Sequence, residues 1–144
     1  MSVASAKLEL PDPSDPELAP YWEGCRAGEL RIPRCRACRR WVWYPRGHCP
    51  GCGGDDIEWT RVSGRGKLYT WVTVRRSFVP WLDGKVPYVA GLVELDEDPA
   101  IRIAAVLDVA PGETLRLEQP VEVFFDDVGG LTLPQFRLRR NMGS

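Results

Sequence analysis

Apolar and polar positions follow a helical period near the start of the chain. The apolar positions spaced as one face of a helix are Leu18, Tyr21, Trp22 and Cys25. Ser14–Glu17 has the Ser-x-x-Glu form of a capping box, with a proline in the first turn. Gly28 is a typical helix terminator. The pattern predicts a helix from about Asp15 to Ala27, with Cys25 buried on its inner face as a small apolar residue.

After Gly64 the period changes to two, with turn residues between the apolar runs. Five segments have this strand pattern: 66–75, 88–95, 101–109, 121–125 and 131–138. No helix of any length is predicted between them, so the segments fit a small closed barrel. A five-stranded Greek-key barrel of the OB type is the simplest such architecture. Gly64 and Gly66 predict a bulge or bend at the start of the longest strand.

Four of the five cysteines form two C-x-x-C pairs with ten residues between them: Cys35, Cys38, Cys49 and Cys52. Four thiolates fill a tetrahedral metal site and leave no open position, so we expect a structural zinc ion that stabilises a small segment. Thiolate geometry alone does not separate zinc from iron, and a rubredoxin-like iron site is the alternative. Disulfides are disfavoured in a chain without a secretion signal. His48, the only histidine, is expected at the surface.

Short strand patterns surround the cysteine pairs. Residues 30–33 lead into the first pair, 41–44 lie between the pairs and 57–62 lead away from the second. The predicted fold class is mainly β, with an N-terminal helix and a four-cysteine zinc ribbon followed by a five-stranded OB-fold barrel. The expected parts, in chain order, are an extended arm (1–13), the N-terminal helix (14–28), the zinc ribbon (29–62) and the barrel (63–140).

Composition limits the class of protein. A chain of 144 residues with 44% hydrophobic and 27% charged residues fits one ordinary folded domain. No apolar run approaches the roughly 20 residues of a transmembrane helix, and we expect a cytoplasmic protein.

Charge is distributed unevenly along the chain. Residues 1–21 sum to −3, residues 22–76 to +7 and residues 77–144 to −5. The basic middle third, rich in arginine, suggests contact with phosphates or an acidic partner, and a solvated face is the alternative.

Sequence motifs for catalysis are missing. One histidine, placed beside a cysteine pair, is a poor basis for a Ser-His-Asp or Cys-His arrangement. Residues 64–67 lack the spacing of a phosphate-binding loop. The acidic residues 96–98 are expected to form a solvated turn. We therefore do not expect the chain to be an enzyme by itself. A binding or assembly role is favoured.

The order of short motifs matches a known pattern. In chain order these motifs are Tyr21–Gly24, Gly28–Leu30, Tyr44–Arg46, Val62–Gly66, Leu68–Thr70, Pro87–Tyr88, Val93–Asp96, Pro120–Val123 and Leu133–Arg137. With the four cysteines, they resemble the rubredoxin-like zinc-ribbon plus OB-fold family that is associated with acyl-CoA enzymes. The resemblance covers residues 14–138. One departure is Arg39, which follows the first cysteine pair where the family usually has glycine.

This resemblance implies a non-catalytic auxiliary subunit that forms a hetero-oligomer with a thiolase-fold enzyme. That enzyme would be a thiolase or a retro-aldolase, with steroid side-chain degradation as one implied pathway and a MaoC-like enoyl-CoA hydratase as a further partner. The subunit would help to bind or position acyl-CoA. Candidate contact residues are three arginines of the ribbon and two aromatic residues of the loop between the first two barrel strands: Arg39, Arg40, Arg46, Phe78 and Trp81.

Two other functions stay open at this point. Zinc ribbons and OB barrels both bind nucleic acids, and aromatic residues are interleaved with the basic segment at Trp41, Trp43, Tyr44 and Trp59. The negative charge of the barrel half argues against such a module. The second open hypothesis is an independent acyl-CoA-binding protein or a small enzyme.

Overall fold

The chain begins its described structure with a turn and a short helix. The computed structural model describes residues 14–76, 86–110 and 112–139. Helix α2 (Ala19–Arg26) starts later than predicted, with Leu18 at the N-cap position and no side-chain cap. The predicted start of the helix at about residue 15 is wrong, because Asp15 forms a turn before the helix. Its carboxylate accepts the Glu17 N–H (3.0 Å) and its carbonyl accepts the Leu18 N–H (3.0 Å).

The C-terminal end of α2 follows the prediction. Gly28 has the left-handed φ of 79°, and the Glu29 N–H donates to the Gly24 carbonyl at 2.8 Å. This is a Schellman motif, in which glycine satisfies the last free carbonyls of a helix. The buried face of α2 contains Tyr21, Trp22, Gly24 and Cys25. Cys25 therefore has the position that the helical period predicts.

The ribbon contains two paired strands. Strand β1 (Leu30–Cys35) pairs antiparallel with β2 (Ile57–Val62), from Leu30 opposite Val62 to Cys35 opposite Ile57. The strand predicted over residues 41–44 is wrong, because only one isolated bridge forms there, between Arg34 and Trp41. Both ends of this segment are fixed by cysteine turns, which leaves no length for a ladder.

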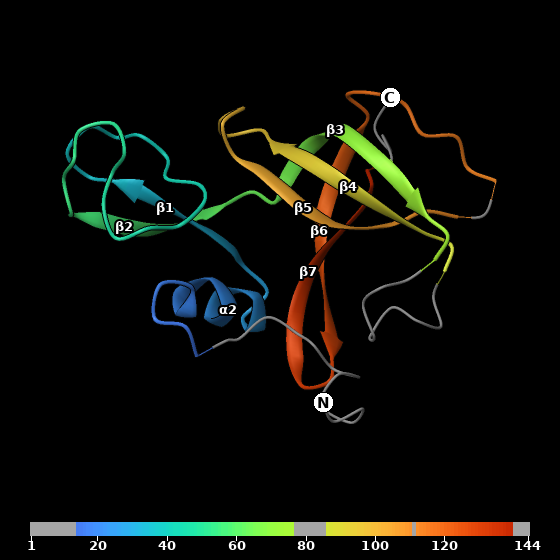
Figure 1. Cartoon of the computed structure of the whole chain (residues 1–144), viewed down its shortest axis with the longest axis horizontal. Helices are drawn as coiled ribbons and strands as arrows, with labels where there is room; N and C mark the ends of the chain where they lie inside the picture. Colours follow the sequence, from blue (N-terminus) through green and yellow to red (C-terminus); the bar gives the residue numbers. More distant parts are fainter. Residues whose placement is uncertain (1–13, 77–85, 111, 140–144) are drawn as a thin grey trace.

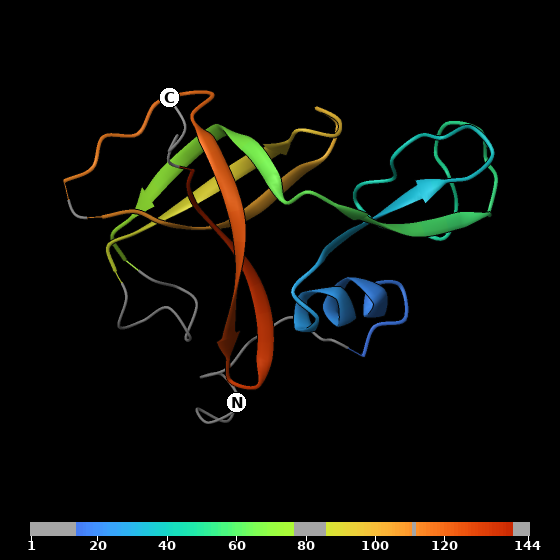
Figure 2. The same ribbon diagram turned by 180° about the vertical axis from the view of Figure 1, so that it is seen from behind.

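The barrel has the five predicted strands. They are β3 (Arg65–Val74), β4 (Tyr88–Leu95), β5 (Arg102–Asp108), β6 (Pro120–Val128) and β7 (Leu131–Leu138). The closed order is β3-β4-β5-β7-β6, with β5 and β7 parallel and the other pairs antiparallel. Figure 1 shows the barrel beside the ribbon, with α2 next to β7, and Figure 2 shows the same arrangement from behind.

Glycines shape the first barrel strand differently from the prediction. The register with β4 shifts between Leu68 and Thr70, so the bulge lies beyond Gly64 and Gly66. A Cβ atom at Gly66 would collide with the carbonyl oxygen of Glu94. This glycine is therefore needed for the close approach of two strands.

One hydrophobic core joins the helix, the ribbon and the barrel. Tyr21, Trp22 and Cys25 of α2 share a cluster with Leu30 and Ile32 of β1 and with buried residues of every barrel strand. A second, small cluster consists of Cys35, Val42 and Cys49. No helix in the described ranges is long and apolar enough to cross a membrane. Phe78 and Trp81 lie outside the described residues.

Candidate metal centre and adjoining groove

The two cysteine pairs meet at one point of the ribbon. The sulfur atoms of Cys35, Cys38, Cys49 and Cys52 all lie within 4.8 Å of one another. Two of the separations are 3.6 Å, between Cys35 and Cys52, and 3.5 Å, between Cys38 and Cys49. A tetrahedral ion with metal–sulfur bonds of about 2.3 Å needs sulfur atoms about 3.8 Å apart. The cluster therefore fits a closed structural metal site.

The same backbone turn is used at both cysteine pairs. In the first turn the Arg39 N–H donates to the Cys35 carbonyl (2.8 Å), and in the second the Gly53 N–H donates to the Cys49 carbonyl (2.9 Å). Arg39 and Gly53 both have a left-handed backbone, with φ of 69° and 77°. The turn therefore needs a positive φ after each pair, and Arg39 adopts it without being glycine.

Backbone N–H groups favour thiolates at the cluster. The Cys38 N–H holds the pKa of Cys35 below its usual value. The N–H groups of Cys52 and Gly51 lower the pKa of Cys49 to about 6. Metal coordination requires the thiolate form, so these groups prepare the site for a cation.

Two residues near the cluster have no place in it. Cys25 is buried in α2, and its burial raises the pKa of the thiol to about 12, so it is protonated and unreactive at neutral pH. His48 is exposed and is not a member of the metal cluster. None of the five cysteines, all of which lie in the described ranges, forms a disulfide.

A groove of about 490 Å³ adjoins the metal centre. Its ribbon wall includes Arg39, Arg40 and Arg46, and its barrel wall is the turn at Asp98 and Ala100. None of the three arginines forms an ion pair with a carboxylate among the residues the structure describes. Three of the predicted contact residues are thus brought together as free cations in one concave surface.

Aromatic residues also line the ribbon wall of the groove. They are Trp41, Trp43 and Tyr44. The Arg34 guanidinium stacks over the Trp41 ring at 4.5 Å, and its Nε–H donates to the Arg39 carbonyl at 2.8 Å. These contacts hold the indole and the neighbouring arginine backbone in a fixed position. The sequence connected these aromatics only with the alternative of a nucleic-acid module, and it predicted the Asp98 turn only as a solvated turn.

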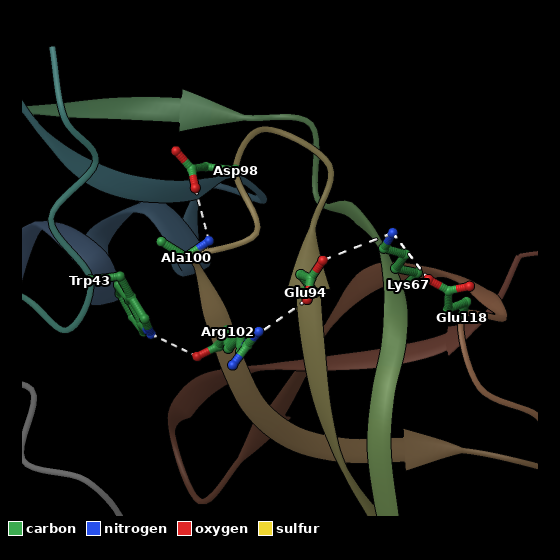
Figure 3. A network of polar contacts seen from close by, with 7 residues as sticks. All are labelled: Trp43, Lys67, Glu94, Asp98, Ala100, Arg102 and Glu118. Carbon is green, nitrogen blue, oxygen red and sulfur yellow. Dashed lines mark hydrogen bonds and ion pairs between the residues drawn. The ribbon is translucent and has the colours of Figure 1, made fainter.

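Trp43 connects the groove to the barrel. Its indole N–H donates to the Arg102 carbonyl at 3.0 Å, across 59 positions of sequence (Figure 3). The Arg102 side chain lies over the Tyr69 ring at 4.0 Å and pairs with Glu94 at 3.5 Å. Lys67 continues this network from Glu94 (3.9 Å) to Glu118 (3.5 Å). No sequence signal indicated this contact.

Comparison with known proteins gives the family. The family model described as the ChsH2 rubredoxin-like zinc ribbon domain matches residues 22–58, and the ChsH2 C-terminal OB-fold domain matches 59–126. The benzoylsuccinyl-CoA thiolase subunit BbsA of Thauera aromatica is 32% identical over 119 residues, covering 80% of this chain and 78% of that protein. The chain belongs to the ChsH2 family of zinc-ribbon and OB-fold proteins.

Two further proteins that are similar to this chain are parts of enzymes. A solved structure of the Ltp2-ChsH2(DUF35) aldolase superposes with a TM-score of 0.79 at 28% identity, covering 89% of this chain and 98% of that one. A probable enoyl-CoA hydratase alpha subunit of Thermomonospora curvata is 30% identical over 118 residues, or 81% of this chain. The present chain spans only 36% of that relative's length. One of these relatives is named as part of an aldolase and the other as a subunit of a probable hydratase, which supports an auxiliary role.

Proposed function

We propose that this chain is a non-catalytic auxiliary subunit of a thiolase-fold acyl-CoA enzyme, a thiolase or a retro-aldolase. The observation that carries the proposal is the match to BbsA, named as a thiolase subunit, which extends over 80% of this chain and 78% of that one. A match of this extent includes both the ribbon and the barrel. The likeness to a chain of the Ltp2-ChsH2 aldolase supports the same role. Steroid side-chain degradation is the pathway we favour for the retro-aldolase case.

The metal in this proposal is zinc, bound by Cys35, Cys38, Cys49 and Cys52. Two of these thiols are fully buried, and the spacing of the four leaves no room for a substrate as a fifth ligand. Zinc would act as a cross-link of the ribbon. Metal analysis of the purified chain is expected to give about one zinc per chain, whereas a rubredoxin-like iron site would colour the protein.

The groove is proposed to hold the phosphate-bearing end of acyl-CoA. Coenzyme A carries a 3′-phosphate and a pyrophosphate, and arginine binds such groups through two parallel N–H donors. Arg39, Arg40 and Arg46 are available because carboxylates of the described residues do not neutralise them. Phe78 and Trp81 stay predicted contacts of the acyl end. A MaoC-like hydratase is proposed as a second partner, and the match to a probable enoyl-CoA hydratase subunit supports a hydratase in that place. The proposed location of the complex is the cytoplasm.

Assembly is tested by purifying the tagged chain from its own host after nuclease treatment and identifying the bound proteins by mass spectrometry. Stoichiometric recovery of a thiolase-fold enzyme is expected. Recovery of no such enzyme, with abundant RNA or DNA in a sample without nuclease, would replace the proposal with a nucleic-acid module.

The role of the groove is tested on the assembled complex. Replacing Arg39, Arg40 and Arg46 by alanine is expected to raise the acyl-CoA KM by at least about tenfold, because each charge-assisted contact is worth about 1.5–3 kcal/mol. Zinc content and kcat are expected to stay the same. Arg36→Ala is the matched control, since Arg36 is an exposed ribbon arginine paired with Asp56 and Glu58 outside the groove. An unchanged KM in the triple variant would remove the acyl-CoA part of the proposal.

A further inference from the structure

We infer that Trp43 is a positioning residue through which the metal centre controls the shape of the groove. In this inference the walls of the groove keep their arrangement only while the four cysteines hold their metal. Such coupling would regulate acyl-CoA binding in the groove, a role that rests on the proposed function. The coupling itself depends only on contacts within this chain.

The ribbon side of the coupling runs through the loop of residues 39–48. A cysteine turn fixes each end of this loop, so its path depends on the cluster. Val42, near its middle, is 1% exposed and packs directly against Cys35 and Cys49. Its N–H also donates to the Pro33 carbonyl at 2.8 Å. The position of Val42, and therefore of the next residue Trp43, is set by how closely the two cysteines are held together.

The barrel side of the coupling begins at the Trp43 indole. Its N–H donates to the carbonyl of Arg102, the first residue of β5, which lies opposite Glu94 of β4. The Arg102 side chain is itself fixed by its ion pair with Glu94 (Figure 3). It also lies over the Tyr69 ring. The indole is therefore bonded to a rigid point of the barrel and not to a free loop.

The groove lies between these two sides. Trp43 forms part of its ribbon wall, and Asp98 and Ala100 form its barrel wall just before β5. The barrel wall is a defined turn, in which the Ala100 N–H donates to the Asp98 carboxylate at 2.8 Å. The indole bond thus fixes the distance between the walls. The Trp43 ring also lies 5.6 Å from the ring of buried Tyr21, which limits its rotation.

Loss of the metal would remove the cross-link between the two cysteine turns. Only weak sulfur–sulfur contacts, such as those between Cys35 and Cys52 and between Cys38 and Cys49, then join the two turns, and Val42 loses its fixed support. The hydrogen bond to Arg102 is consequently lost or weakened, and the arginine wall moves relative to the Asp98 turn. The barrel strands keep their own ladders, so the expected change is local to the groove.

The test uses ¹H–¹⁵N NMR of the full chain with zinc and after chelation. Exchange protection of the Trp43 indole N–H is expected to fall about tenfold on chelation, the scale of one hydrogen bond. The backbone amides of residues 98–103 are expected to shift, while those of the β6–β7 hairpin stay in place. Trp43→Phe keeps an aromatic ring but has no N–H to donate. In that variant the amides of 98–103 are expected to be shifted already with zinc bound, and to respond little to chelation.

Trp41→Phe is the matched control, since Trp41 lines the same groove and its indole has no bond to the barrel among the described residues. It is expected to respond to chelation as the wild type does. The inference is overturned if chelation leaves the Trp43 indole protected, or if Trp43→Phe responds like the wild type. It is also overturned if chelation shifts all barrel amides equally, because the effect is then not local. No partner or acyl-CoA is present, so the proposed function can fail while this result holds, and the reverse.

Discussion

The backbone of Arg39 offers a direct test of how the metal-binding turns are built. Arg39 has a φ of 69° at the position that Gly53 fills in the second turn, with a φ of 77°. A left-handed conformation costs an L-residue about 1–2 kcal/mol. Glycine avoids this cost but loses about 0.5–1 kcal/mol more conformational entropy on folding. Arg39→Gly is therefore expected to stabilise the zinc-loaded protein by about 0.8 kcal/mol.

The second turn provides the reverse substitution. Gly53 is exposed and a Cβ there meets no atom within 4 Å, so the backbone cost is expected to dominate the effect of Gly53→Arg. It is expected to destabilise the protein by about 0.8 kcal/mol. The double variant, with arginine and glycine exchanged between the turns, is expected within about 0.5 kcal/mol of the wild type.

Urea unfolding at fixed excess zinc measures all three variants, because stability then depends on the same metal concentration. The midpoints are expected to move in opposite directions with unchanged slopes, and zinc content is expected to stay at about one per chain. A lower midpoint for Arg39→Gly would refute the reasoning. It would mean that the Arg39 side chain contributes more than its backbone conformation costs.

Three further outcomes are expected. Gly66→Ala should cost about 2 kcal/mol in urea unfolding, because its Cβ would meet the Glu94 carbonyl, whereas Gly47→Ala, which meets nothing, should stay within about 0.5 kcal/mol. Cys38→Ser should reduce bound zinc from about one per chain to nearly none by metal analysis. Burial raises the pKa of Cys25 from 9.0 to about 12. The raised value stabilises the fold fully below about pH 9, and this contribution is lost as the pH rises toward 12. Cys25→Ala should therefore reduce the loss of stability between about pH 8 and about pH 10.5, and an identical loss in the variant would contradict this account.

Local patterns were enough to predict several parts of the fold. The spacing of Cys35 and its three partner cysteines predicted their convergence, and the helical period placed Cys25 in the core. The two-residue period predicted five barrel strands. Each of these features depends on residues close together in sequence, or on a period of apolar residues that is specific to a helix or to a strand. Gly28 at the end of α2 belongs to the same class, because a positive φ there is a local requirement.

Other parts of the structure depend on which of two local conformations forms, or on contacts between residues that are far apart in sequence. The Asp15 side chain and carbonyl form a turn before the helix, so α2 begins at Ala19 and not at about residue 15. The bulge after Leu68 follows from pairing with β4 and not from the glycines before it. The groove needs Trp43 and Arg102, which are 59 residues apart, to touch. Nothing in either local sequence indicates that contact.

The boundary between the two matched family regions falls inside a strand. One region ends at residue 58 and the next begins at 59, whereas β2 runs over Ile57–Val62 and is fully paired with β1. A protein cut there would lose most of the ladder that holds the metal-binding loop. Such a cut would also disrupt the shared core, because α2 and β1 bury their apolar residues with those of the barrel. Recombination between genes could therefore transfer this fold intact only as a whole, from α2 through β7.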